Sequence, residues 1–286
     1  MLNRRRDGTL RAWRRIAAAA GAHTFLALGA VVMLFPFVSM IATSLKPAEE
    51  TLIWPPHLLP VEWTLANYPA VLNAAPFARY FVNSIVVSVG ATLSVILTSL
   101  IGGFIFGKYT FPGKRFLFLL ILASAMFPFE TYMIPLYLTM KSLGWINTYL
   151  GLASPYVIMS FGIFLMRQHI DHGIPNELLD AARVDGASEL QIFVRVIVPL
   201  SSSAIGAVGI LAFMQSWAAF IWPLLIATDR RMYLMELGLS TFQFRYTSDY
   251  HLLSAASVLN TLPMLIAFII LRRRILESVA ITGLKG

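Results

Sequence analysis

The sequence predicts an all-α protein that crosses a lipid bilayer about six times. Three observations carry this prediction. Apolar residues make up 58% of the 286 positions, charged residues make up only 13%, and the apolar residues gather in long runs. A soluble domain carries about 25% charged residues, roughly twice the share found here. Lipid is therefore the expected solvent for most of the chain, and helices satisfy their own backbone groups in that solvent.

Six apolar runs are long enough to form spans, because a helix needs about 20 residues to cross the hydrocarbon core. The predicted spans are residues 16–45, 80–107, 116–140, 149–166, 200–228 and 252–271. The second contains no charged residue, and the fourth is short and contains Pro155. A cleaved signal peptide is an alternative for the first run, but signal peptides have apolar cores of only about 7–15 residues.

Basic residues predict the orientation of these spans. If the N-terminus is cytoplasmic, sixteen of the 22 lysines and arginines lie in cytoplasmic segments and six lie outside. Cytoplasmic loops are enriched in lysine and arginine, so we expect both termini in the cytoplasm. These flanking residues also explain the net charge of +8, and no nucleic acid is expected as a partner.

We expect one transmembrane domain over residues 1–286, with four segments outside the bilayer. These are a cytoplasmic N-terminus (1–15), an external loop (46–79), a cytoplasmic loop (167–199) and a cytoplasmic C-terminus (272–286). The external loop is rich in proline, which favours extended chain. Its Trp54 and Trp63 are of the type that anchors at a membrane interface.

The cytoplasmic loop between spans four and five is predicted to contain a short helix that ends at a glycine. Pro175 suits the start of a helix, and Glu177 complements the positive end of the helix dipole. Gly186 suits the left-handed position just after a helix. Such an element either docks on a soluble partner or packs on the protein's own cytoplasmic face.

A second helix is predicted to follow the glycine. Ser188 and Gln191 match a capping box, in which each side chain bonds the other's backbone N–H. Pro199 disfavours helical geometry at the residue before it, so a boundary or kink is expected at Val198.

This loop is similar to the EAA loop of permeases from ATP-binding-cassette (ABC) importers. The family pattern is Glu-Ala-Ala, three residues, Gly, nine residues, Ile, one residue and Leu-Pro. The same spacing falls here on Asp180-Ala181-Ala182, Gly186, Val196 and Val198-Pro199. The departures are Asp for Glu and Val for both Ile and Leu, and each keeps the charge or the apolar character.

The resemblance covers nearly the whole chain and is to the carbohydrate-uptake (maltose-type) branch. The stretches that carry it are residues 126–130, 134–137, 144–149, 161–168, 217–224, 249–256 and 283–286. One departure is Ala218, where the branch commonly has Asn after the Trp.

The resemblance implies a non-catalytic permease subunit in the inner membrane of a prokaryote, paired with a second homologous permease. A dimer of ABC ATPase subunits would bind ATP and Mg, so this chain needs no cofactor or metal. An extracytoplasmic solute-binding protein would deliver a carbohydrate. The helix in the loop would fit a cleft in the ATPase, and the implied coupling residues are Glu177, Asp180, Ala181, Ala182, Asp185 and Gly186.

Glu130 is the only acidic or basic residue well inside a predicted span, and it is a candidate for the translocation pathway. It follows Arg115 by 15 residues, or ~22 Å along a continuous helix. A charge at that depth is costly and indicates function, although a neighbouring helix at the outer interface is an alternative partner. The other pathway candidates are Asn83, Gln215, Trp217 and Asn260. Polar residues in spans also join helices, so each has this second interpretation.

Two other motifs are explained without a catalytic site. Gly102, Gly107 and Lys108 match the start of a phosphate-binding loop, but the following Ser or Thr is missing and the glycines lie in a predicted span. We expect these glycines to permit close helix packing. His169 and His172 with Asp171 lack the further ligands of a metal site.

Two other classes of function compete with the ABC permease. A self-contained secondary transporter usually has repeated halves with broken helices, and no internal repeat is evident here. A membrane scaffold with a docking loop is the other. The sequence does not identify the sugar, and glycerol phosphate and oligosaccharides are alternative substrates.

Overall fold

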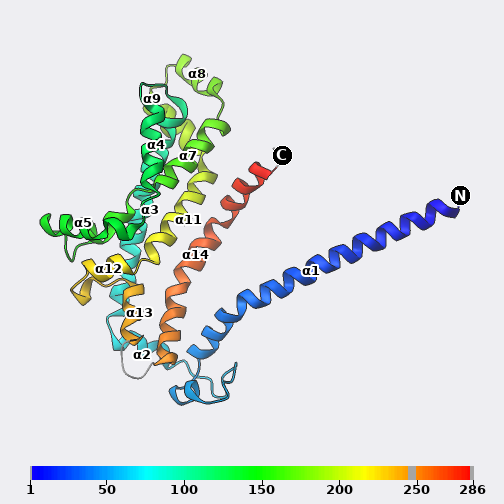
Figure 1. Cartoon of the computed structure of the whole chain (residues 1–286), viewed down its shortest axis with the longest axis vertical. Coiled ribbons are helices and arrows are strands. Elements are labelled where there is room, and N and C mark those ends of the chain that lie inside the picture. The colour runs from blue at the N-terminus through cyan, green and yellow to red at the C-terminus, as the bar shows by residue number, and fades with distance from the viewer. Residues whose placement is uncertain (1, 244–248, 284–286) are drawn as a thin grey trace. The chain divides into compact units, whose positions relative to one another are not determined.

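The computed structural model describes the backbone of residues 2–243 and 249–283, and the side chains of residues 19–242 and 249–270. The described residues form helices and loops without a strand, which confirms the predicted all-α class (Figure 1). The elements are α1 Leu2–Ser44, η1 Ala48–Leu52, α2 Asn67–Ala74, α3 Phe77–Lys108, α4 Lys114–Ser124, α5 Phe129–Ser142, α6 Tyr149–Ala153, η2 Ser154–Tyr156, α7 Ser160–Gly173, α8 Asn176–Val184, α9 Glu189–Ile192, η3 Phe193–Ile197, α10 Val198–Leu200, α11 Ser202–Trp217, α12 Ile221–Ile226, η4 Arg230–Met232, α13 Met235–Gln243 and α14 Tyr250–Gly283.

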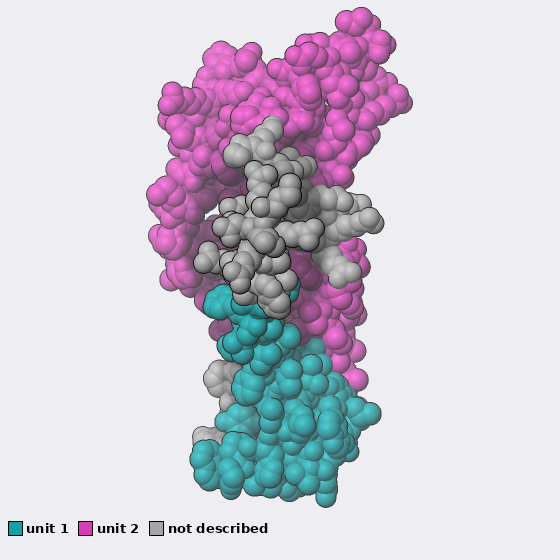
Figure 2. All heavy atoms as spheres, turned by 90° about the vertical axis from the view of Figure 1, so that its right-hand side faces the viewer, with its two compact units in different colours: residues 1–71, 246–258 teal, residues 72–245, 259–286 magenta. Residues whose placement is uncertain are grey.

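The chain forms two compact units, which are coloured separately in Figure 2. The first contains residues 1–71 and 246–258, and the second contains residues 72–245 and 259–286. The candidate coupling residues and the candidate pathway residues all belong to the second unit.

In the first unit, helix α1 is followed by a folded loop rather than by a plain connector. The Lys46 ammonium donates to the carbonyl of His57, and the Glu50 carboxylate accepts the N–H groups of Val61 at 2.8 Å and Glu62 at 3.3 Å. The side-chain amide of Asn67 donates to two carbonyls at the end of α1, each at 2.8 Å. The charged groups of this proline-rich segment therefore hold its turns together.

Three helices are long and apolar enough to cross a bilayer as single elements, and three bent pairs raise the possible number to six. The continuous helices are residues 19–44 of α1, α3, and residues 250–270 of α14. They match the first, second and sixth predicted spans. The predicted spans 116–140, 149–166 and 200–228 are each interrupted, so none of them is a single straight helix.

The interruptions have local causes. Helix α4 meets α5 at an angle of 94°, and Pro128 precedes α5, where a proline disfavours helical geometry at the residue before it. Pro155 lies in the short η2 turn before α7, and that pair bends by 53°. The bend at α4–α5 also removes the basis for placing Glu130 ~22 Å beyond Arg115, because that estimate needs a straight helix.

Helix α3 is the central element of the second unit, and it packs along α7 and α11 (Figure 1). Glycines allow this approach. A Cβ atom at Gly103 would lie 2.7 Å from the Met166 side chain and 2.9 Å from the backbone nitrogen of Arg167. A Cβ atom at Gly162 on α7 would lie 2.5 Å from the hydroxyl of Ser99 on α3. The predicted packing role of the glycine run in α3 is confirmed.

Two polar clusters fix the opposite ends of this helix packing. At the C-terminal end of α3, the Lys108 ammonium donates to the carbonyls of Asp171 and Ile174 and to the side chain of Asn176. In the N-terminal half of α3, the buried Asn83 bonds the segment around η4. The loop 167–199 therefore lies at the Lys108 end of α3.

Replacing Gly103 by Val tests the α3–α7 packing. The added atoms meet a backbone nitrogen that cannot move independently of α7, so we expect a loss of about 1–3 kcal/mol of stability. Thermal unfolding of the purified chain in detergent measures this loss. The matched control is Gly90→Ala in the same helix, where a Cβ atom meets nothing within 4 Å. An equal melting temperature for both variants would contradict the packing assignment.

Candidate functional site

Helix α8, at the Lys108 end of α3, forms the core of the candidate site. Pro175 immediately precedes it in an extended conformation, and Glu177 lies in its first turn. Its last turn carries Arg183. The helix is strongly amphipathic in sequence: only Leu179 is buried, at 1% exposure, and Ala182 packs partly against the same cluster. That cluster also includes Phe104 of α3, so a single leucine anchors α8 on the membrane helices.

The opposite face of α8 is open to solvent. Its exposed residues include the predicted Glu177, Asp180 and Ala181, together with Leu178 and Val184 at 43% and 87% exposure. Asp185 and Gly186, which follow the helix, are also exposed. The structure thus brings the six sequence-predicted coupling residues into one short segment, with Ala182 on its inner side and the others facing outward.

An ion-pair network fixes the shape of this segment. The Arg183 guanidinium donates to Asp180 at 2.8 Å and to Glu189 at 2.9 Å. The Tyr109 hydroxyl, in the loop after α3, donates to the same Glu189 carboxylate. The hydrogen bonds that Arg183 donates to Glu189 and Asp180 raise the pKa of Arg183 above its usual range. Burial, with the bond to Glu189, raises the pKa of Tyr109 to about 12, so this hydroxyl remains a donor at neutral pH.

Sequence reasoning missed three members of this network: Arg183, Glu189 and Tyr109. The pair Asp180–Arg183 has the i, i+3 spacing of a helical ion pair, which was a visible signal. Tyr109 lies 80 positions from Glu189, and no local pattern could have joined them.

The turn after α8 has the geometry that its glycine predicted. Gly186 adopts φ +81°, in the left-handed region that a β-branched residue avoids. The backbone N–H of Gly186 bonds Arg183, and that of Ala187 bonds Ala182, each at 3.0 Å. The predicted capping box is confirmed as well. The Ser188 N–H donates to the Gln191 side chain at 2.8 Å, and the Gln191 N–H donates to Ser188 at 3.3 Å.

The predicted break at Val198 lies elsewhere. Val198 is helical, and the bend of 77° falls between α10 and α11, where Ser201 leaves helical geometry. Before the proline, residues 193–197 form a π-helical turn, and the Val198 N–H donates to Phe193 five residues back. Pro199 has no N–H and its ring crowds the preceding turn, so the widened turn accommodates it inside the helix.

Two motifs set aside in the sequence have structural roles. Lys108, the residue that suggested a phosphate-binding loop, directs its ammonium at the C-terminal carbonyls of α7 and at Asn176 of α8. Cations complement the negative end of a helix dipole, so Lys108 ties α3, α7 and α8 together. Asp171 pairs with Arg167 at 3.7 Å, and a ring nitrogen of His169 contacts the Leu200 carbonyl at 3.2 Å.

Three predicted pathway residues are bonded inside the fold. Asn83, at 1% exposure, donates to the carbonyls of Arg231 and Tyr233 at 2.9 and 3.0 Å and accepts from the Tyr149 hydroxyl. Trp217, also at 1% exposure, donates to the Asn260 carbonyl at 3.1 Å. The Asn260 side chain in turn donates to Glu236 at 2.8 Å.

The other two pathway candidates, Gln215 and Glu130, are exposed and have no hydrogen-bond partner in the described part of the chain. Gln215 lines a cleft of about 330 Å³ where the broken helix pairs meet. The other residues that line this aromatic cleft are Phe129, Tyr132, Pro155, Tyr156, Ala218, Phe220, Ile221 and Trp222. Glu130 lies next to Phe129 in the first turn of α5. The cleft therefore combines ring faces with one free amide.

Comparisons with known proteins cover the segment that carries both candidate sites. The family described as "Binding-protein-dependent transport system inner membrane component" matches residues 99–277, a segment that includes α8, its ion-pair network and the aromatic cleft.

Two curated relatives cover most of the chain. The arabinooligosaccharides transport system permease protein AraQ of Halalkalibacterium halodurans is 34% identical over 90% of this chain and 93% of its own. The diacetylchitobiose uptake system permease protein NgcG of Streptomyces coelicolor is 30% identical over 93% and 88%. A solved structure of a bacterial ABC transporter that imports the acidic polysaccharide alginate has the same fold. It has a TM-score of 0.80 and 22% identity, and the match covers 91% of this chain and 96% of that one.

Proposed function

Because the chain belongs to the family of binding-protein-dependent transport system inner membrane components, we propose that it is the permease subunit of an ATP-driven ABC importer for a carbohydrate. The observation that carries the proposal is helix α8, a short helix anchored by one buried leucine with its charged face left open. Relatives that cover about nine-tenths of the chain are named as permeases for oligosaccharide or disaccharide uptake.

In this proposal the exposed face of α8 binds an ABC ATPase and moves with it. A force delivered there must reach the membrane helices through a stiff connection. The structure supplies three such connections. They are the packing of Leu179 in the core, the bonds that join Arg183, Glu189 and Tyr109, and the bonds of Lys108 to α7 and α8. Asp180 holds Arg183 in place and keeps 67% of its side chain exposed, so it serves both the loop and the partner.

The neighbouring leucines of α8 test this assignment. Leu179→Ala opens a cavity in the core and should cost about 2–5 kcal/mol of stability. Leu178→Ala should change stability by less than about 0.5 kcal/mol. It should also weaken binding of the ATPase by about fivefold, as expected for an interface side chain worth about 1 kcal/mol. Thermal unfolding and binding of the purified ATPase measure the two effects, and unchanged ATPase binding by Leu178→Ala would contradict the docking role.

We further propose that the sugar passes the aromatic cleft. Sugars expose faces of C–H groups that pack on aromatic rings and hydroxyls that need hydrogen bonds. Tyr132 and Phe220 provide accessible rings, and the Gln215 amide is free to donate and accept. A cleft of about 330 Å³ is near the lower end of the size range of small-molecule sites. In this proposal Glu130, which is next to Phe129 in the sequence, lines the same route. Asn83, Trp217 and Asn260 do not line it but hold neighbouring helices together by hydrogen bonds inside the fold.

Replacing Gln215 by Ala should raise the substrate concentration at half-maximal uptake about threefold or more, since one hydrogen bond contributes about 0.5–1.5 kcal/mol. Stability should stay unchanged, because the side chain has no partner among the described residues. Gln168→Ala removes the same group from α7 outside the cleft and is the matched control. Equal uptake constants in the two variants would remove Gln215 from the pathway.

The remaining partners follow from the same proposal. A second homologous permease completes the translocation unit, an extracytoplasmic binding protein delivers the sugar, and ATP and Mg bind the ATPase dimer rather than this chain. Both termini lie in the cytoplasm of a prokaryote. The end of the second unit that carries α8 also carries four basic residues, Lys108, Lys114, Arg167 and Arg183. Their presence agrees with a cytoplasmic location for this end.

Reconstituted vesicles test the mode of transport. We expect uptake of a labelled oligosaccharide only when the ATPase, the second permease and the binding protein are present with ATP, and vanadate should abolish it. Uptake driven by an ion gradient without ATP would support a secondary transporter instead. If the complete assembly moves no member of a panel of oligosaccharides and glycerol phosphate, the carbohydrate-import proposal is rejected and a scaffold role gains support.

A further inference from the structure

A further cleft in the second unit shares no residue with either candidate site. It has a volume of about 980 Å³ and is formed by the loop after α3, the first turns of α4 and one residue of α7. Its lining residues are Thr110, Phe111, Gly113, Lys114, Arg115, Phe116, Phe118, Leu119, Leu122 and Arg167. Basic and apolar side chains make up most of the lining, and no acidic residue is among them.

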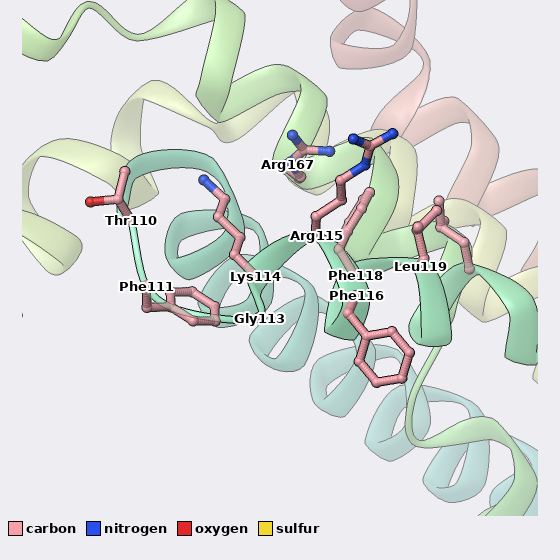
Figure 3. Close-up of a pocket in the computed structure, with 10 residues that line it drawn as sticks. Thr110, Phe111, Gly113, Lys114, Arg115, Phe116, Phe118, Leu119 and Arg167 are labelled. Atoms are coloured by element: carbon pink, nitrogen blue, oxygen red, sulfur yellow. The ribbon is translucent and has the colours of Figure 1, made fainter.

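The three basic groups gather on one side of this basic cleft. Figure 3 shows the side-chain nitrogens of Lys114, Arg115 and Arg167 on the same side, with the rings of Phe111 and Phe116 on the other. Phe116 is 65% exposed and Leu119 is 53% exposed, and both lie in the first two turns of α4. The surface therefore changes from cationic to apolar within two turns of α4.

The cations differ in how far the protein satisfies them. Arg167 lies over the Phe118 ring at 4.3 Å, donates to the Phe106 carbonyl and pairs loosely with Asp171. Lys114 donates to the Tyr109 carbonyl at 2.8 Å. Arg115 makes no hydrogen bond or ion pair with any residue that the structure describes. One full guanidinium thus remains for an external anion.

The position of the cleft indicates what kind of anion it meets. Lys108 ends the span α3 and Lys114 begins the next apolar helix, so the cleft lies where the spans leave the hydrocarbon. Basic pockets at this level between membrane helices bind anionic lipid headgroups. A soluble anion would have no use for the exposed Phe116 and Leu119, whereas acyl chains would cover them.

We propose that Lys114, Arg115 and Arg167 bind the headgroup of an anionic phospholipid, whose acyl chains lie on Phe116 and Leu119. A phosphodiester with two free oxygens suits the guanidinium of Arg115, which can donate two parallel hydrogen bonds. The lipid joins the α3–α4 loop to α7, next to the bonds by which Arg167 and Lys108 connect α3 with α7 and its C-terminal end. This site is separate from the transport pathway and does not depend on which solute is carried.

Native mass spectrometry of the full-length chain in micelles that contain equal amounts of phosphatidylglycerol and phosphatidylcholine tests the proposal. We expect a preference of about fivefold or more for phosphatidylglycerol, the contribution of roughly one basic residue at a membrane surface. Arg115→Gln should remove most of that preference without lowering thermal stability, and Lys114→Gln should reduce it in the same direction. Arg195→Gln, an equal change of charge at an exposed position of the neighbouring loop, should leave it intact.

Four results would overturn the lipid assignment. Equal retention of the two lipids would exclude a specific site, and equal losses in Arg115→Gln and Arg195→Gln would indicate general charge attraction. Full displacement of the lipid by millimolar inorganic phosphate would indicate a site for a soluble anion. Loss of the preference when the ATPase and the second permease are bound would assign the cleft to a protein partner.

Discussion

The close contact between α3 and α7 is the constraint on which the second unit depends. Two helices can approach this closely only where side chains are missing, and Gly102, Gly103 and Gly162 leave them out. In lipid there is little hydrophobic drive for helices to associate, so packing and polar bonds must stabilise the pair. Lys108 adds the polar bonds at the C-terminal end, where it binds the carbonyls of α7. Helix α8, which follows α7 in the chain, inherits its position from this contact.

Helix α8 illustrates that inheritance. It is too short to be stable alone in water, because isolated helices below about 12–15 residues are marginal. Leu179 anchors it on the core, the Gly186 turn reverses the chain, and the Ser188–Gln191 box starts the next helix. The remaining face is free for another protein. In the docking role that we propose, such a helix would transmit displacement, because several bonds hold it and its apolar anchor is buried.

The broken helices fit the proposed pathway. A continuous span offers only side chains to a solute, whereas an interrupted span also frees backbone groups and brings side chains from several helices to one point. The interruptions at α4–α5 and η2–α7, together with the break between α11 and α12, adjoin the aromatic cleft. Prolines at positions 128 and 155 account for two of them, and at the third, Ala218 and Phe220 leave helical geometry between α11 and α12. The cost of an irregular backbone in the membrane is thereby concentrated where the structure offers a cavity.

The sequence by itself determined the features that rest on composition and short-range pattern. Apolar runs defined the helical membrane class, basic residues suggested the cytoplasmic ends, and residues 175–191 predicted a helix, a left-handed glycine and a capping box. These depend on neighbours within about four positions, where local stereochemistry decides.

The tertiary structure alone decided which polar side chains are hydrogen-bonded inside the fold. Asn83 reaches Tyr233 across 150 positions, Tyr109 reaches Glu189 across 80, and Lys108 reaches Asn176 across 68. The tertiary structure also decided that three spans bend. A proline near an apolar run permits either a break or a continued helix. Pro199 lies within a helix, whereas a break adjoins Pro128. The choice depends on the neighbouring helices that satisfy the freed backbone groups, and only the packed fold specifies them.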